Sequence, residues 1–237
     1  MPHRPSGPGR PGPRTPAHRA AARATAVLAV CSALLVALVA THWHPLLALD
    51  SAVSRTTHRW AVRDSGVTHV FRVLTDWVWD PLTMRLLAAG AALWLILRRG
   101  AWWPALWLVL TCALAAGVQQ VMKAAVGRPR PVWPDPVDSA RYAAFPSGHA
   151  MTAMVVCGLL LWLLRRRTAS TALWGAAVAA SVVTVAGVGL TRVWLGVHWP
   201  SDVLGGWLLG ALMVTAAVAV YEWPRVDGGH RPSRRPE

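Results

Sequence analysis

The chain has 237 residues, of which 54% are hydrophobic and only 14% charged, a balance too apolar for an ordinary soluble domain of this length. Its formal net charge of +14 comes almost entirely from arginine. Because the arginines stand in short clusters between apolar runs, they favour a membrane protein over a nucleic-acid binder. Cys31, Cys112 and Cys157 fall inside apolar runs without metal-ligand spacing, so we interpret them as small buried residues, not as a disulfide framework.

Both ends of the chain differ in composition from the middle. Residues 1–23 hold six prolines in the first sixteen positions. Such a composition cannot bury a core, so we expect a disordered basic tail there. Residues 222–237 predict a second disordered basic tail, which leaves 24–221 as one membrane domain.

Six apolar runs lie between the tails, and each is 17 to 22 residues long. About 20 helical residues cross the hydrocarbon layer, and only helices satisfy their own backbone groups in lipid over such lengths. The sequence therefore predicts an all-α fold, a six-transmembrane helical bundle. The predicted spans are 24–41, 82–98, 101–122, 148–164, 171–190 and 203–221.

The first run could instead be the core of a signal peptide behind a basic start. Leu38 stands where a cleavage site ending at Ala40 requires a small residue. We therefore expect the first run to be a retained helix.

The connection 42–80 mixes four arginines with four aspartates, so it cannot span a membrane. Its apolar residues recur at helical spacing and predict a short helix lying on the interface, between spans one and two. They are Val67, Val70, Phe71, Leu74, Trp77 and Val78.

The placement of arginine predicts the orientation. With six spans, both tails and the short loops at 98–99 and 165–167 lie on one side, and they hold fourteen of the 24 basic residues. By the positive-inside rule that side is the cytoplasm. We expect a multi-pass protein of a bacterial plasma membrane with both termini cytoplasmic. The loops 42–80, 123–147 and 191–202 then face outward.

Three stretches on the predicted outer side carry polar residues that orientation does not explain. They are Lys123 with "GRPRP" (127–131), "PSGH" (146–149) and "TRVWLGVHWPSD" (191–202). Lys123, Arg130 and Arg192 are cations suited to phosphate oxygens. Ser147 and Gly148 begin a helix whose first N–H groups favour an anion. The predicted guest is a phosphate group.

Two histidines and an aspartate add the working parts of phosphoryl transfer. His198 precedes Asp202 by four residues, and a carboxylate near one ring nitrogen leaves the other free to attack phosphorus. His149, in the first turn of its helix, can protonate the leaving oxygen. Metal is the alternative explanation, but Asp135, Asp138 and Asp202 do not form the dense acidic cluster of a two-metal phosphatase. We therefore expect neither a metal nor a cofactor.

Order and spacing of these motifs resemble the type 2 phosphatidic acid phosphatase superfamily, in its membrane lipid phosphatase branch. The family pattern is Lys, six residues, Arg-Pro; then Pro-Ser-Gly-His; then Ser-Arg, five residues, His, three residues, Asp. This chain matches it from Lys123 to Asp202, except that Thr191 stands in place of the serine. Threonine keeps the hydroxyl, so we expect activity to survive.

The resemblance implies a role for each matched residue. His198 is then the nucleophile that forms a phosphohistidine, Asp202 orients it, and His149 protonates the leaving group. The phosphate is bound by the remaining matched residues, Lys123, Arg130, Ser147, Gly148 and Arg192. The implied activity is metal-independent removal of phosphate from lipid phosphates or diphosphates at the extracytoplasmic face.

Several points stay open at this stage. The substrate is a lipid phosphate in the bilayer, such as phosphatidic acid, phosphatidylglycerol phosphate or undecaprenyl diphosphate, and no nucleic acid is expected. A vanadate-dependent haloperoxidase-like enzyme and a non-catalytic phospholipid binder or transporter are the alternatives. The oligomeric state is undetermined. Arg85 lies inside the second span, about one turn from its outer end, where snorkelling is the favoured interpretation over a functional charge.

Overall fold

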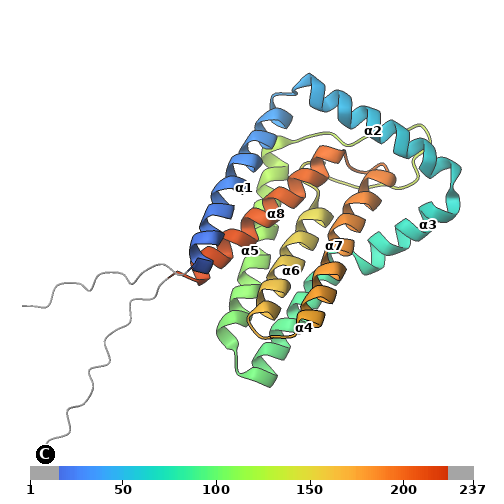
Figure 1. The fold of residues 1–237 in the computed structure, drawn as a ribbon. Helices are drawn as coiled ribbons and strands as arrows, with labels where there is room; N and C mark the ends of the chain where they lie inside the picture. Colours follow the sequence, from blue (N-terminus) through green and yellow to red (C-terminus); the bar gives the residue numbers. More distant parts are fainter. Residues whose placement is uncertain (1–15, 224–237) are drawn as a thin grey trace, which may run out of the picture.

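A computed structural model describes residues 16–223. The chain forms nine helical segments, and no strand occurs within the described residues (Figure 1). In order they are α1 (Pro16–Ala40), α2 (His44–Arg63), α3 (Ser65–Val73), the π-helix η1 (Leu74–Val78), α4 (Pro81–Arg99), α5 (Trp102–Val126), α6 (Gly148–Arg165), α7 (Thr171–Trp194) and α8 (Pro200–Tyr221).

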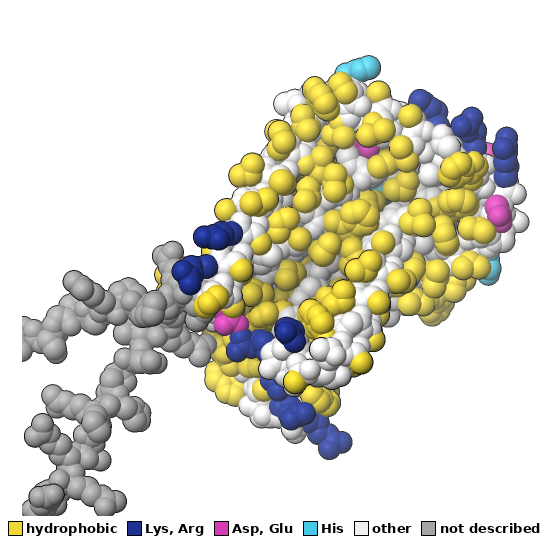
Figure 2. Space-filling model, in the orientation of Figure 1, with side chains coloured by type: hydrophobic (Ala, Val, Ile, Leu, Met, Phe, Trp, Pro, Cys, Tyr) yellow, Lys and Arg dark blue, Asp and Glu magenta, His cyan; other side chains and the backbone are white. Residues whose placement is uncertain are grey.

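Six helical stretches are long and apolar enough to cross a membrane, and they correspond to the six predicted spans. The second of them joins α3 and η1 to α4 as Ser65–Arg99. Figure 2 shows hydrophobic side chains over the middle of one face, with Lys and Arg near its two ends. The predicted all-α, six-span bundle is confirmed.

Helix α6 lies at the centre of the bundle. It packs against α4, α5, α7 and α8, while α1 packs mainly along α8 (Figure 1). The main core is apolar and includes Leu108, Met151, Leu159 and Val188, each nearly inaccessible. In lipid such an interface gains from close packing, because the hydrocarbon around it is as apolar as the core.

Both termini of the described chain lie at the same end of the bundle as the α4–α5 and α6–α7 connections (Figure 1). The opposite end holds α2, the 127–147 loop and the α7–α8 turn. The three loops that the sequence assigned to one side therefore do share one end. We call it the loop end.

Two expectations were wrong in part. Residues 16–23, assigned to a disordered tail, form the first turns of α1; residues 1–15 and 224–237 lie outside the described chain. The connection 42–80 contains α3 and η1 as predicted, but also the 20-residue helix α2. Apolar spacing did not indicate α2 because its buried side is mostly polar, with Asp50, Ser54, Thr57 and His58 facing the protein.

Candidate active site

The N-termini of α6 and α8 meet at the loop end. The Ser147 N–H donates to the Asp202 carbonyl oxygen at 2.9 Å, which joins "PSGH" to the last motif. A small residue permits this approach, because a Cβ on Gly206 would lie 2.6 Å from the Ser147 carbonyl oxygen and 3.0 Å from the Met151 nitrogen. Both atoms belong to backbone, so neither can turn aside.

Gly206→Ala is therefore expected to lower the free energy of unfolding by about 1–3 kcal/mol, since the two helices must separate. Gly90→Ala is the matched control: a Cβ there meets nothing within 4 Å, and alanine favours a helix by about 0.5–1 kcal/mol over glycine. Thermal unfolding in detergent measures both. Equal melting temperatures for the two variants would contradict the close-packing argument.

His198 is 2% exposed and lies in the turn before α8. Its Nε2 is 3.2 Å from Arg130 Nη1, and its Nδ1 is 3.4 Å from Asp202 Oδ2. A guanidinium can only donate, so Nε2 carries the lone pair and the proton sits on Nδ1, on the aspartate side. The nitrogen with nucleophilic capacity therefore faces the cations.

Burial lowers the pKa of His198 well below 6.5, and the positive charges of Arg130, Arg192 and Lys123 lower it further. Desolvation and like charge both disfavour the imidazolium form. His198 is consequently neutral at neutral pH, with its Nε2 lone pair available. The same cations show that residues of the first and the last motif meet around one ring.

Asp202 belongs to a buried network that the sequence did not indicate. Its Oδ1 accepts from Arg128 Nη1 at 2.7 Å, and its Oδ2 accepts from the Trp199 N–H at 2.8 Å. Arg128 Nη2 also donates to Asp50 Oδ2 at 2.7 Å. Asp50 in turn accepts from the Ser201 N–H at 2.9 Å and from its hydroxyl at 2.5 Å.

One buried guanidinium thus joins two buried carboxylates, one from α2 and one from α8. The pairing is what allows these charges to be buried, because an unpaired charge in an apolar interior is strongly unfavourable. Arg128 stands in "GRPRP" two residues before the motif arginine, which is the only hint that the sequence offered.

Arg192 is 4% exposed, and its Nη1 donates to the Thr75 hydroxyl at 3.2 Å. Its Nε and the Ser147 hydroxyl are buried without a hydrogen-bond partner among residues 16–223. Buried polar groups are nearly always satisfied. Two orphan groups at the start of α6 and the end of α7 are what a bound anion would satisfy.

Residues 138–143 lie over these cations, and we call them the cover segment. Lys123 Nζ donates to the Ala143 carbonyl at 2.5 Å, and Arg130 Nε donates to the Tyr142 carbonyl at 2.9 Å. Asp138 Oδ2 lies 3.9 Å from Arg192 Nη1. Backbone and carboxylate oxygens of the chain therefore occupy donors that would otherwise meet an anion.

His149 lies in the first turn of α6, and its Nε2 is 3.9 Å from Asp80 Oδ2. Asp80 also accepts from the Leu82 N–H at 2.7 Å as the cap of α4. Gly148 lies against the Gln119 amide, since a Cβ on it would be 2.6 Å from Gln119 Nε2. Asp80 and Gln119 are further neighbours that the motif did not indicate.

The remaining residues singled out in the sequence have structural partners. Thr191 donates to the Val188 carbonyl at 2.9 Å and is buried, so its methyl group is accommodated. Asp135 is exposed and lies 3.0 Å from His58 Nε2; that hydrogen bond lowers the pKa of Asp135. Asp135 therefore lies apart from the cations, unlike Asp138 and Asp202.

Comparison with known proteins places this arrangement in context. The sequence model of the PAP2 superfamily matches residues 104–225. A phosphatidylglycerophosphatase B from Bacillus subtilis is 28% identical over 181 residues, 76% of this chain and 86% of that protein. An undecaprenyl-diphosphatase from Sulfolobus acidocaldarius is 30% identical over 154 residues, 61% of this chain and 64% of that protein.

A solved structure has the same fold. The crystal structure of a transmembrane PAP2 type phosphatidylglycerolphosphate phosphatase from Bacillus subtilis matches with a TM-score of 0.75 and 24% identity. The match covers 86% of this chain and 98% of that one. It supports the six-helix architecture independently of the motifs.

Proposed function

Because the chain belongs to the PAP2 superfamily, we propose that it is an integral membrane phosphatase acting on lipid phosphates or diphosphates through a phosphohistidine intermediate. The names of the relatives from Bacillus subtilis and Sulfolobus acidocaldarius support this substrate class. The observation that carries the proposal is the neutral, buried His198 with Nε2 turned toward Arg130.

In the first half-reaction, the substrate phosphate accepts hydrogen bonds from Lys123, Arg130 and Arg192. It replaces the oxygens of the cover segment and Nε2 of His198 as the partner of these donors. The orphan groups of Arg192 and Ser147 and the first N–H groups of α6, beginning at Gly148, complete its binding site. Nε2 then forms a bond to phosphorus as the bond from phosphorus to the leaving oxygen breaks.

Proton transfer balances both half-reactions. His149 gives a proton to the leaving oxygen, and Asp80 Oδ2 lies 3.9 Å from its Nε2. A water molecule then attacks the phosphohistidine, His149 takes one of its protons, and inorganic phosphate leaves. Asp202, 3.4 Å from Nδ1, stabilises the positive charge on His198 in the intermediate.

We place this site at the extracytoplasmic face of a bacterial plasma membrane, with both termini in the cytoplasm. The support is that both ends of the described chain and the α4–α5 and α6–α7 connections lie opposite the loop end. Together with the two tails, these segments carry fourteen of the 24 basic residues in the sequence, and the positive-inside rule assigns such segments to the cytoplasm. The substrate tail can then remain in the outer leaflet while its phosphate reaches the helix ends.

The proposal is tested by phosphate release from purified protein in detergent. Phosphatidic acid, phosphatidylglycerol phosphate and undecaprenyl diphosphate are compared by kcat/KM, with and without chelator. We expect hydrolysis that chelator does not change, because Lys123, Arg130 and Arg192 offset the phosphate charge without a metal. No phosphate release from any of them, or full loss with chelator, would overturn it. Halide oxidation with added vanadate is the assay for the haloperoxidase alternative.

The pH dependence follows from the lowered pKa of His198. A group whose folded pKa is depressed takes up its proton only at more acidic pH, so the nucleophile stays neutral down to below pH 6.5. We expect the acid limb of kcat/KM that belongs to His198 to lie below pH 6.5. The substrate phosphate itself titrates near pH 6, so the comparison between variants on one substrate is the decisive measurement.

Arg130→Met removes one of the positive charges that lower the pKa of His198. Its residual activity is expected to show an acid limb moved to higher pH relative to the wild-type chain, on the same substrate. A limb that stays in place, or moves to lower pH, would contradict the assigned cause.

A further inference from the structure

Arg192 differs from the other two phosphate-binding cations in its burial. It is 4% exposed, whereas Lys123 and Arg130 are only partly buried. Its Nη1 donates to the hydroxyl of Thr75 in the π-helix η1 at 3.2 Å. The direction in which this guanidinium points is therefore set by protein groups around it and not by solvent.

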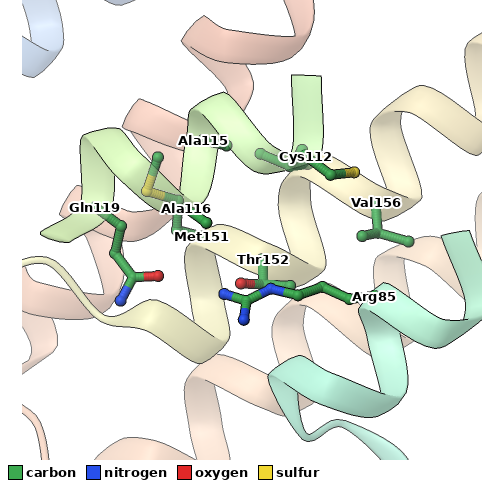
Figure 3. Close-up of a pocket in the computed structure, with 9 residues that line it drawn as sticks. Arg85, Cys112, Ala115, Ala116, Gln119, Met151, Thr152 and Val156 are labelled. Atoms are coloured by element: carbon green, nitrogen blue, oxygen red, sulfur yellow. The ribbon is translucent and has the colours of Figure 1, made fainter. Parts of the chain in front are cut away.

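Arg85 shows what an arginine without such a setting looks like. Figure 3 shows it beside Thr152 and Gln119, between α4, α5 and α6. The residue is exposed, as snorkelling predicts. The cavity beside it measures about 10 Å³, which is far too small for a phosphate group. Arg192 is therefore the better-fixed arginine of the two.

The bond to Thr75 uses only one of the three nitrogens of the Arg192 guanidinium. Nη1 donates to Thr75, while Nε is buried without a hydrogen-bond partner among residues 16–223. Nε and Nη2 lie on one edge of the planar group, and Nη1 lies outside that edge. Such an edge can donate two parallel hydrogen bonds to two oxygens of a phosphate. Thr75 therefore holds Arg192 by the nitrogen that this edge does not need.

A second hydroxyl fixes the direction of the bond. Thr191 Oγ1 lies 2.9 Å from the Val188 carbonyl oxygen and 3.4 Å from Thr75 Oγ1. A hydroxyl has one proton and a carbonyl can only accept, so Thr191 donates to Val188 and accepts from Thr75. The proton of Thr75 is then used, and its lone pairs are left for Arg192, which can only donate.

The π-helix η1 brings Thr75 to this position. The Trp79 N–H donates to the Leu74 carbonyl at 2.8 Å, across five residues, and π-turns of this kind are frequent at functional sites. Thr75 is 0% exposed. Trp79 packs on Gly187, where a Cβ would lie 2.4 Å from its ring. Gly187 and Thr191 are four residues apart and share a face of α7, so η1 contacts that face at two points.

We propose that Thr75 is a positioning residue for the reaction: its hydroxyl holds Nη1 of Arg192 so that the Nε and Nη2 edge faces the substrate phosphate. This inference rests on the proposed function, because it assigns that edge to the phosphate. Thr75 itself does not touch the substrate. Donors fixed before the reaction need no reorganisation as charge develops, whereas an unheld arginine loses alignment and leaves a buried donor unpaired.

Thr75→Val tests the proposal, because it keeps the shape of the side chain and removes the hydroxyl. Orthovanadate, an analogue of the transferred phosphate, is titrated into the full chain in detergent by calorimetry. We expect its Kd to rise about 10- to 100-fold, and kcat/KM for phosphatidic acid to fall by a similar factor, the effect of one hydrogen bond to a charged group. Thr75→Ser keeps the hydroxyl and should stay within about threefold of the wild-type chain.

Thr111→Val is the matched control. Thr111 is also a buried threonine, but its hydroxyl donates only to the Trp107 carbonyl of its own helix, α5, at 2.8 Å. This variant should bind orthovanadate as the wild-type chain does. Melting temperatures show whether each variant is folded. If Thr75→Val is not, Thr191→Val removes the acceptor of the Thr75 proton instead, and we expect a rise in Kd of about 3- to 10-fold.

A double-mutant cycle separates positioning from a merely structural role. If Thr75 acts through Arg192, the substitution Thr75→Val should add no more than about a twofold loss of kcat/KM in a chain that already carries Arg192→Met. Losses that multiply in the double variant would show that Thr75 acts independently of the guanidinium, and the positioning role would be wrong.

The outcomes distinguish this inference from the proposed function. Wild-type kcat/KM in folded Thr75→Val protein, or no recovery in Thr75→Ser, would overturn the positioning role, while lipid phosphate hydrolysis by the wild-type chain still upheld the function. Orthovanadate binding that depends on Thr75, in a chain that hydrolyses no lipid phosphate, would uphold the arrangement of Arg192 and overturn the function. Neither binding nor hydrolysis by the wild-type chain would overturn both.

Discussion

Purified His198→Ala protein is expected to release phosphate from lipid substrates at least about 10⁴-fold more slowly than the wild-type chain, because it lacks the attacking nitrogen. The variant should also form no phosphorylated protein. Brief reaction with radiolabelled substrate, followed by an alkaline quench, detects the phosphohistidine of the wild-type chain. The Nε2 atom of His198 lies 3.2 Å from Arg130 Nη1, on the side of the phosphate-binding cations.

His69→Ala is the matched control for this experiment. His69 is an exposed histidine of α3, in the same 42–80 connection but in none of the motifs. It should keep wild-type kcat and KM. Turnover by His198→Ala at the rate of this control would refute the assignment of the nucleophile.

Arg128→Ala should lower the free energy of unfolding by about 3–5 kcal/mol, as is typical when one partner of a buried ion pair is removed. It leaves the buried carboxylates of Asp50 and Asp202 without their shared guanidinium. Its kcat should fall more than KM rises, because Asp202 loses the contact that fixes it 3.4 Å from His198. Chemical unfolding in detergent and steady-state kinetics measure the two effects.

A second substitution separates charge burial from simple loss of packing. In Arg128→Ala/Asp50→Asn one of the two unpaired charges is gone, so part of the stability should return. Arg55→Ala, an exposed arginine of α2, should leave both stability and kinetics unchanged. If the double variant is no more stable than Arg128→Ala, the network does not act through its charges.

The six spans were predictable because lipid imposes one rule over a long stretch: every residue in the span must be apolar enough and helical. Local chemistry marks their ends as well, for instance Asp80 with Pro81 at the start of α4. The predicted span boundaries were wrong chiefly where a helix continues beyond the hydrocarbon layer. Residues 16–23 contain polar side chains and prolong α1, which hydropathy alone cannot show.

Some residues of the candidate site could be predicted from the sequence, and others could not. Its motif residues were predictable because their order and spacing were already sufficient to identify them. Asp50, Thr75 and Asp80 were not, since each reaches the site from the 42–80 connection by tertiary packing alone. Helix α2 is the clearest case, because its buried stripe is polar. The burial of Asp50 is explained only by its hydrogen bonds from Arg128 and Ser201.

The cover segment competes with free inorganic phosphate for the same hydrogen-bond donors. Inorganic phosphate in the medium must compete with oxygens of the protein itself, which are tethered and so present at a high effective concentration. A free ion brings no further binding energy, whereas a lipid headgroup arrives already concentrated at the surface by its tail. Under the proposed function, rebinding of the product is therefore disfavoured, and we expect hydrolysis to continue in surroundings rich in phosphate.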